Sequence, residues 1–302
     1  MDPVKLCRIL IPLLLLSLMF ACGKRADAAL EDESSVYSEH LRDEIPPDEL
    51  KRESQASQQG ELLPLEKYNY TWTDGAGIPD IVIIVDDFGN SGGALLSDFA
   101  KLPSEVAFAI LPDLPFTRQS GELAAQYGHE VLIHVPMQPV STSEKPGKNY
   151  IRTDADANEI SSLIADFSAQ LPMAVAANNH MGSAVTADRN AMASVLRALH
   201  AQGLFFVDSA TSTQSVGTAL ARNLGYPALK RDIFLDVPDN SAATLAGKIS
   251  SLEKFKGRRE PIVIITHCHN RAKLEALQSF ITQIQSMGLR LTTLSAAGKI
   301  AA

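Results

Sequence analysis

The sequence predicts an α/β fold, a (β/α) barrel with seven or eight parallel strands, on two observations. From residue 78 to the end of the 302-residue chain, short apolar runs alternate with helical segments, as expected when each strand is followed by a helix. Several apolar runs also end in Asp or His, and the carboxyl ends of parallel strands are where such folds carry their chemistry. An open, doubly wound sheet is the alternative.

The strands are predicted from runs rich in β-branched residues. The first run, 81–85, has no alternation of apolar and polar residues, which indicates a strand buried on both faces. The other strands are expected at 106–110, 131–134, 174–177, 204–207, 262–266 and 289–294, with a less certain one at 228–230 or 233–235. Helices are expected at 116–127, 158–170, 188–201, 242–254 and 271–287. Gly203 and Gly288 end two of these helices, as glycine commonly does.

The first 76 residues are predicted to lie outside the barrel. Lys5 and Arg8 precede an apolar stretch at 9–21, which is short for a membrane span and typical of a secretion signal. Cys22 follows this stretch, an arrangement that resembles bacterial lipoproteins, whose first mature residue is a lipidated cysteine. Simple secretion or an uncleaved anchor is the alternative. We expect a signal peptide at 1–21, a flexible polar tether at 22–76 and a barrel domain at 77–302.

The expected location is the bacterial envelope, with a lipid on Cys22 as the link to a membrane. Gly23 lacks the Asp that signals inner-membrane retention in many Gram-negative lipoproteins, so in such a cell we expect the outer membrane, facing the periplasm. The net charge of −8 gives no sign of nucleic acid binding. With Cys7 in the signal and Cys22 lipidated, Cys268 has no partner for an intrachain disulfide.

Polar residues gather at the predicted strand ends. Asp86 and Asp87 end the first strand, and two adjacent carboxylates there need a compensating positive charge, usually a metal ion. Other strand ends carry His134, the segment 178–183 with Asn179 and His180, then Asp208, and His267. Each residue alone has an ordinary structural explanation, as a helix cap, a turn residue or a buried histidine. Together on one face of a barrel they indicate a functional site.

Two histidines and a carboxylate suit Zn²⁺, which in catalytic sites takes three protein ligands and keeps a position open for water. A second carboxylate nearby can accept the proton of that water, and a further histidine can protonate the leaving group. This set of residues predicts metal-assisted hydrolysis of an amide or an ester.

The domain resembles the divergent polysaccharide deacetylases, a branch of the carbohydrate esterase and deacetylase barrel superfamily. The resemblance covers residues 78–294 and depends on five segments in the same order, 83–89, 128–137, 178–183, 206–209 and 231–236. It implies a distorted barrel of the glycoside hydrolase and deacetylase type. It also implies removal of N-acetyl groups from an amino-sugar polysaccharide in the envelope or outside the cell.

The resemblance also implies roles for individual residues. In the superfamily the first Asp of the pair is the catalytic base and the second binds the metal, which maps to Asp86 and Asp87. His134 matches a metal ligand, and His267 matches the histidine that acts as the acid. The usual second metal histidine, four residues after the first, is Gln138 here, so we expect His180 to replace it. Supporting or substrate contacts are expected from Asp208, Asn179, Gln138, Arg231 and Asp232. Asp208 is a candidate for orienting a histidine ligand, and Asp232 is a candidate for an ion pair with its neighbour Arg231.

Two other functions stay open. A catalytically weak or inactive barrel that binds a glycan or an envelope partner is favoured by Gln138. A Mg²⁺ phosphohydrolase built on Asp86 and Asp87 would need a basic residue for the phosphate, and the histidine-rich strand ends argue against it.

Overall fold

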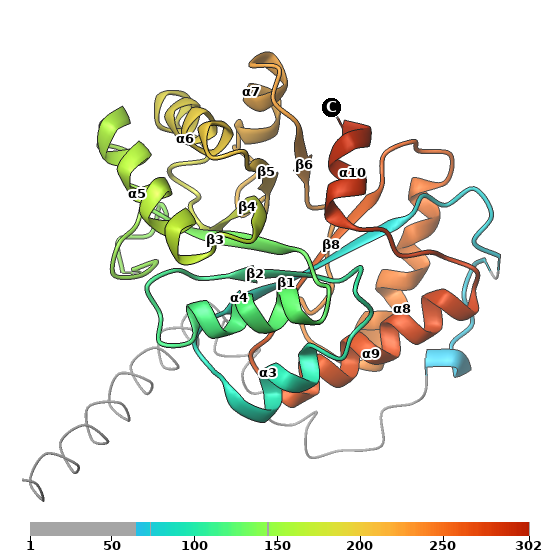
Figure 1. Ribbon diagram of the computed structural model, residues 1–302. Helices are drawn as coiled ribbons and strands as arrows, with labels where there is room; N and C mark the ends of the chain where they lie inside the picture. Colours follow the sequence, from blue (N-terminus) through green and yellow to red (C-terminus); the bar gives the residue numbers. More distant parts are fainter. Residues whose placement is uncertain (1–64, 73, 144, 302) are drawn as a thin grey trace, which may run out of the picture. The chain divides into compact units, whose positions relative to one another are not determined.

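A computed structural model describes residues 65–72, 74–143 and 145–301, and these residues form one parallel sheet with helices around it (Figure 1). The predicted signal peptide, Cys22 and the tether up to residue 64 lie outside the described residues. The strands are β1 (Ile81–Phe88), β2 (Ala107–Ile110), β3 (Val131–Met137), β4 (Ala174–Met181), β5 (Phe205–Asp208), β6 (Ala228–Lys230), β7 (Ile233–Phe234) and β8 (Ile262–His267). Their order is β6-β5-β4-β3-β2-β1-β8-β7, and all neighbours are parallel. The predicted α/β class with a parallel, barrel-like sheet is confirmed.

The short segment between β6 and β7 connects the two edges of the sheet. The N–H of Arg231 donates to the carbonyl of Asp208 at the end of β5, and the N–H of Asp232 donates to the carbonyl of Val263 in β8. Two consecutive residues therefore belong to opposite edges of the sheet. Both strands that the sequence offered in this region, β6 and β7, are present, and the connection between them distorts the barrel.

The helices follow the strands as the alternating pattern predicts. They are α3 (Gly93–Phe99), α4 (Thr117–Gln126), α5 (Ala157–Gln170), α6 (Arg189–Ala201), α7 (Gly217–Asn223), α8 (Ala242–Ser251), α9 (Arg271–Ser286) and α10 (Leu294–Ala301), with 3-10 turns η1 (Leu65–Lys67) and η2 (Leu252–Phe255). Side-chain caps start α5, α6, α8 and α9, and they come from Asp156, Asp188, Ser241 and Asn270. Among the described residues, no helix is both long and apolar enough to cross a bilayer.

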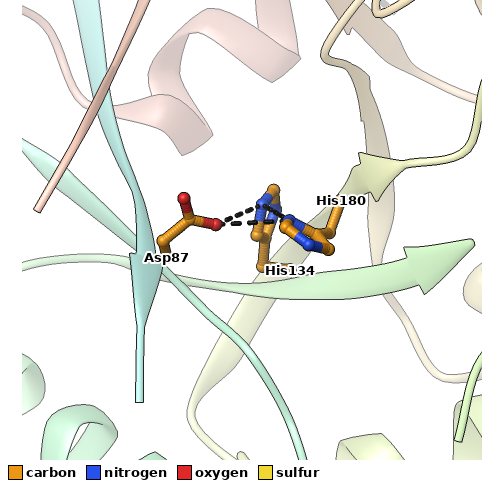
Figure 2. A group of neighbouring side chains, drawn as sticks. All are labelled: Asp87, His134 and His180. Carbon is orange, nitrogen blue, oxygen red and sulfur yellow. Dashed lines mark hydrogen bonds and ion pairs between the residues drawn. The ribbon is translucent and has the colours of Figure 1, made fainter. Parts of the chain in front are cut away.

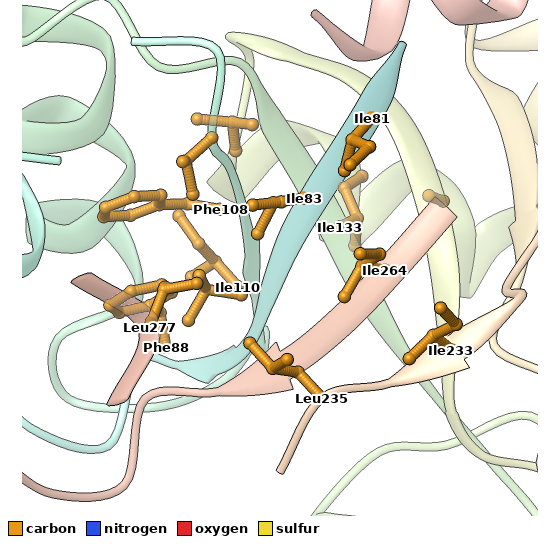
Figure 3. Packing of buried hydrophobic residues seen from close by; sticks show 14 of the residues in the cluster. Ile81, Ile83, Phe88, Phe108, Ile110, Ile133, Ile233, Leu235, Ile264 and Leu277 are labelled. Carbon is orange, nitrogen blue, oxygen red and sulfur yellow. The ribbon is translucent and has the colours of Figure 1, made fainter. Parts of the chain in front are cut away.

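Side chains of the strands alternate between two apolar clusters, because successive residues of a strand point to opposite faces. On β1, Ile81, Ile83 and Val85 belong to the outer cluster, which packs against the helices; Figure 3 shows it with Leu277 of α9. Val82 and Ile84 belong to an inner cluster built from strand residues and α10. The inner cluster contains the small residues Ala107 and Ala109 on β2 and Ala176 on β4, which leave room for the strands that face them.

Helix α10 covers the amino end of the inner cluster. Leu294 and Ala297 lie in that cluster, and the N–H of Ser295 donates to the carboxylate of Glu130, which directly precedes β3. Polar residues gather at the opposite end of the strands. One end of the barrel is therefore apolar and covered, and the polar residues lie at the other.

Two predicted boundaries change in the structure. Residues 289–294 do not form a strand, because only Leu291 makes an isolated bridge, to Ile81, before α10 begins. The last part of the predicted tether, 65–76, contributes to the domain. Leu65 and Trp72 are buried in the outer cluster, and the Trp72 indole N–H donates to the carbonyl of Ser250 in α8. The domain therefore includes residues from 65 onward.

Candidate metal centre

Strand β1 ends in a bulge that brings two neighbouring carboxylates to the same place. Its pairing with β2 shifts register between Val85 and Phe88, and Asp87 has a φ of +71°. In a regular strand Asp86 and Asp87 would point to opposite faces, but a left-handed residue at a bulge re-aims its side chain. Both carboxylates approach Nε2 of His134, Asp87 Oδ1 at 3.2 Å and Asp86 Oδ2 at 3.8 Å.

The alternation of the strands brings the remaining polar residues to the same end. Asp86 continues the inward series of Val82 and Ile84, and a polar residue likewise stands two positions after an inner apolar residue on other strands. These pairs are Leu132 and His134, Ala176 and Asn178, Val207 and Ser209, Leu229 and Arg231, and Ile265 and His267. A second step along β4 adds His180.

Asp87, His134 and His180 form a compact cluster (Figure 2). Asp87 Oδ1 lies 3.2 Å from His134 Nε2 and 3.3 Å from His180 Nδ1, and the two ring nitrogens are 3.1 Å apart. All three side chains are buried. Three residues from β1, β3 and β4 thus direct one potential ligand atom each at the same point.

Asn178 determines which nitrogen of His134 faces this point. Its Nδ2 donates to Asp86 Oδ1 at 2.8 Å and contacts the Ser209 hydroxyl at 3.3 Å, so its Oδ1 must accept from His134 Nδ1, 2.8 Å away. The proton of neutral His134 is therefore on Nδ1, and a lone pair on Nε2 faces Asp87 and His180.

This arrangement fits a divalent metal ion. Among the described residues, Asp87 Oδ1 is one of the few buried side-chain atoms without a hydrogen-bond partner. A tetrahedral ion such as Zn²⁺, with bonds of about 2.0–2.2 Å, separates its ligand atoms by roughly 3.3–3.5 Å, close to the spacings in the cluster. The three residues could hold such an ion with little rearrangement.

The pKa values of the carboxylates differ in direction. Burial raises the pKa of Asp86 above its ordinary value, although His134, His267 and the Asn178 amide act in the opposite direction. Burial would also raise the pKa of Asp87, but interactions with His134, His180 and His269 outweigh it and hold this pKa well below the usual range. The pair therefore separates into one carboxyl with raised proton affinity and one strongly stabilised anion.

His267 lies beside Asp86 across the β1–β8 pairing and is held by Asp236. Its Nδ1 is 2.9 Å from Asp236 Oδ2, which also accepts from the Lys273 ammonium at 2.7 Å. Burial alone would lower the pKa of His267, but the carboxylate of Asp236 more than offsets this and raises it to about 9. His267 is therefore a charged imidazolium at neutral pH, and its Nε2 is the ring nitrogen left for a further partner.

Other predicted site residues support loops instead. Asp208 Oδ2 accepts from the Ser215 hydroxyl at 2.6 Å, so it organises the loop before α7 and does not orient a histidine. Asn179 points away from its neighbour Asn178, and its Oδ1 accepts from the N–H of Ser209. Gln138 Oε1 accepts from the N–H of Thr153, which fixes the loop before α5.

Arg231 and Asp232 do not form the predicted ion pair with each other. Asp232 pairs with Arg258 at 2.7 Å and accepts from the N–H of Val263, early in β8 and away from the carboxyl ends of the strands. Arg231 stays at the site: its guanidinium donates to the carbonyls of Ser209 and Ala210 and lies 3.7 Å from the centre of the Phe234 ring.

Three residues of the site were missed from the sequence: Asn178, Asp236 and His269. Asn178 could have been predicted from His180, because residues two positions apart in a strand lie on the same face of the sheet. Asp236 follows β7, a strand too short to be assigned firmly. His269 Nε2 lies 2.7 Å from Asp87 Oδ2, beyond the end of β8, where strand alternation no longer predicts direction.

Comparisons with known proteins give the family and the fold of the chain. Residues 83–297 match the family described as divergent polysaccharide deacetylase. The chain belongs to this family. Curated relatives of the chain include the uncharacterized protein YibQ of Escherichia coli K12, 37% identical over 166 residues, and an uncharacterized protein of Haemophilus influenzae Rd, 36% identical over 162 residues. The matches cover 54% and 52% of this chain and 50% and 55% of the relatives, so the chain spans about half the length of each.

A solved structure shares the fold. An uncharacterized protein of Agrobacterium tumefaciens C58 superposes with a TM-score of 0.67 at 22% identity, over 77% of this chain and 94% of that one. This likeness supports the barrel-like architecture of the domain.

Proposed function

We propose that the protein is a metal-dependent hydrolase that removes N-acetyl groups from an amino-sugar polysaccharide of the envelope or the extracellular space. The observation that carries the proposal is the convergence of Asp87, His134 and His180 on one point, with Asp86 and His267 next to each other at the same end of the sheet. Zn²⁺ is the proposed ion, because two imidazoles and one carboxylate are a set of ligands it takes in hydrolases.

His180 supplies what Gln138 does not. Gln138 occupies the position of the superfamily's second metal histidine, but its side-chain oxygen is engaged by Thr153. His180 comes from the neighbouring strand, where its register partner on β3 is Pro136, two residues after His134. Loss of the usual histidine therefore leaves a complete set of three ligands.

The proposed reaction needs one base and one acid, and this chain has both. When bound, a divalent ion polarises the amide carbonyl and makes the attacking water more acidic. Asp86 Oδ2 accepts the proton of the water, while Asp86 Oδ1 stays bonded to Asn178. His267 Nε2 donates a proton to the departing amine nitrogen as the carbon–nitrogen bond breaks, which releases acetate and the free amino sugar.

Replacing His180 by alanine tests the metal site. Zinc affinity should fall at least about tenfold, since no other described residue directs a free ligand atom at the same point. Affinity is measured on dialysed protein by competition with a chromogenic chelator, with His200→Ala, an exposed histidine on α6, as the control. Unchanged affinity in His180→Ala would remove His180 from the site.

The substrate class is tested by acetate release from chitin oligomers and from peptidoglycan fragments, with and without a chelator. Chelator-sensitive release from either class supports the proposal. No release from metal-loaded protein would favour a barrel that binds glycan without catalysis.

We further propose that a lipid on Cys22 holds the domain at an envelope membrane, with the segment up to residue 64 as a spacer. The support is the sequence alone: basic residues and an apolar stretch precede Cys22. Cys22→Ser should release the protein from the membrane fraction or leave an unprocessed precursor. Unchanged fractionation of the variant, with a mature N-terminus elsewhere, would refute lipidation.

A further inference from the structure

His269 occupies a position next to the candidate metal ligands that none of the mechanistic steps above uses. It follows β8 and directly precedes Asn270, the N-cap of α9. Its Nε2 lies 2.7 Å from Asp87 Oδ2, and its ring stacks on that of His267 with centroids 5.2 Å apart and an interplanar angle of 23°. The side chain therefore touches both a proposed metal ligand and the proposed acid.

We propose that His269 is a positioning residue of the metal centre, whose Nε2–H holds Asp87 Oδ2 so that only Oδ1 is presented to the ion. This inference rests on the proposed function, because it assigns the partner of one of the three metal ligands.

The contact has a defined polarity. An ionised carboxylate can only accept hydrogen bonds, so the short contact between Asp87 Oδ2 and His269 requires the proton to be on Nε2. The other oxygen, Oδ1, is one of three buried side-chain atoms that have no hydrogen-bond partner among the described residues. The two oxygens of one carboxylate are thus divided between a fixed donor and the ligand cluster.

The backbone aims the Asp87 side chain at the site but does not determine which of its two oxygens faces the cluster. Asp87 lies at the bulge of β1 with a φ of +71°, a conformation that residues other than glycine adopt rarely. A carboxylate with two free oxygens can turn or bind a metal through both of them. Donation from His269 to Oδ2 selects binding through one oxygen, which keeps a coordination position open for water.

The ring of His269 is itself held in place. It stacks on His267, which also stacks on the Phe234 ring at 5.6 Å between centroids, with an interplanar angle of 25°. Three planar side chains lie in sequence, and His267 is fixed by Asp236. The donor that holds Asp87 is therefore attached to a rigid part of the site.

The test compares substitutions that keep or remove the donor. His269→Gln retains an N–H that can reach the same oxygen, His269→Met has a similar length without a donor, and His269→Phe keeps a ring that stacks on His267. Zinc affinity is measured by chelator competition on dialysed protein, and the visible spectrum of the Co²⁺-loaded protein reports the coordination of the ion. Asp87→Asn and His200→Ala are the reference variants.

We expect His269→Met and His269→Phe to bind zinc about 10–100-fold more weakly than the wild type, the usual effect of removing a ligand's hydrogen-bond partner. Their Co²⁺ spectra should also change, while His269→Gln should stay within about threefold of wild-type affinity because it restores the charge-assisted hydrogen bond. His200→Ala should match the wild type in both measurements.

Different outcomes overturn different parts of the proposal. If Asp87→Asn binds zinc as tightly as the wild type, or the wild type binds none, the metal centre and the role of His269 both fail. If Asp87→Asn binds weakly but His269→Met and His269→Phe bind normally, only the role of His269 fails. Equal weakening in Gln, Met and Phe variants would also refute the donor role, since the N–H would then make no difference.

Discussion

Replacing His267 by alanine is expected to lower turnover by roughly 10²–10⁴-fold while leaving zinc affinity nearly unchanged. The imidazole is held through Nδ1 by Asp236, which leaves Nε2 to protonate the departing amine. Without that proton the amine leaves poorly, although water can still attack. The measurement is acetate release from N-acetylated oligomers by metal-loaded protein, alongside zinc affinity by chelator competition. Turnover within a few-fold of the wild type would exclude His267 as the acid.

The pH dependence gives the same prediction a second readout. An acid must be protonated to act, and the Asp236 carboxylate raises the pKa of His267 to about 9. On the alkaline side, wild-type turnover should therefore hold until the pH rises through about 9. In Asp236→Asn the main charge that favours the imidazolium is gone, so the alkaline fall should move down toward the ordinary histidine value of 6.5. An alkaline limb at the same pH in both proteins would contradict this assignment.

Asp86→Asn is expected to lose activity by about 10²-fold or more and to keep its metal. Asparagine has nearly the same shape, and its oxygen can still accept from Asn178, so the structure around His134 should persist. What the variant loses is the carboxylate oxygen that takes up a proton.

The two properties are measured on the same preparation, zinc by chelator competition and turnover by acetate release. Asp188→Asn is a matched control, because Asp188 caps α6 and asparagine caps a helix equally well. Near-normal turnover in Asp86→Asn would make Asp86 a structural residue. Loss of zinc together with turnover would make it a metal ligand.

Much of the fold and the centre of the site could be predicted because both depend on simple periodicities. Continuous apolar runs gave the buried strands, and their ends placed Asp86, His134 and His267 on one face. The same two-residue period, applied further, distinguishes Asn178 from Asn179 and shows that Asp208 follows the inward Val207 on the opposite face. Asn179 and Asp208 were assigned to the site because each belongs to a motif at a strand end. The alternation of side chains along the strand was not applied to them, and it directs both away from the site.

The remaining features depend on contacts that no periodicity encodes. The bulge interrupts the alternation of β1 and turns the Asp87 side chain to the same face of the sheet as Asp86. The approach of His269 to Asp87 depends on how the chain leaves β8, and 182 residues separate the two in sequence. Residues 289–294 have the apolar composition of a strand, but Leu294 and Ala297 are spaced for a helix face that covers the inner cluster.

The connection at Arg231 and Asp232 also determines how the sheet meets other molecules. An open parallel sheet has two edges whose free N–H and C=O groups can pair with strands of another chain and start aggregation. Here the edge strands are β6 and β7, only three and two residues long, and they are consecutive in the chain. The residues between them use their own N–H groups on β5 and β8. Very little unpaired strand is left at either edge, so the domain is protected from edge-to-edge association without a closing row of hydrogen bonds.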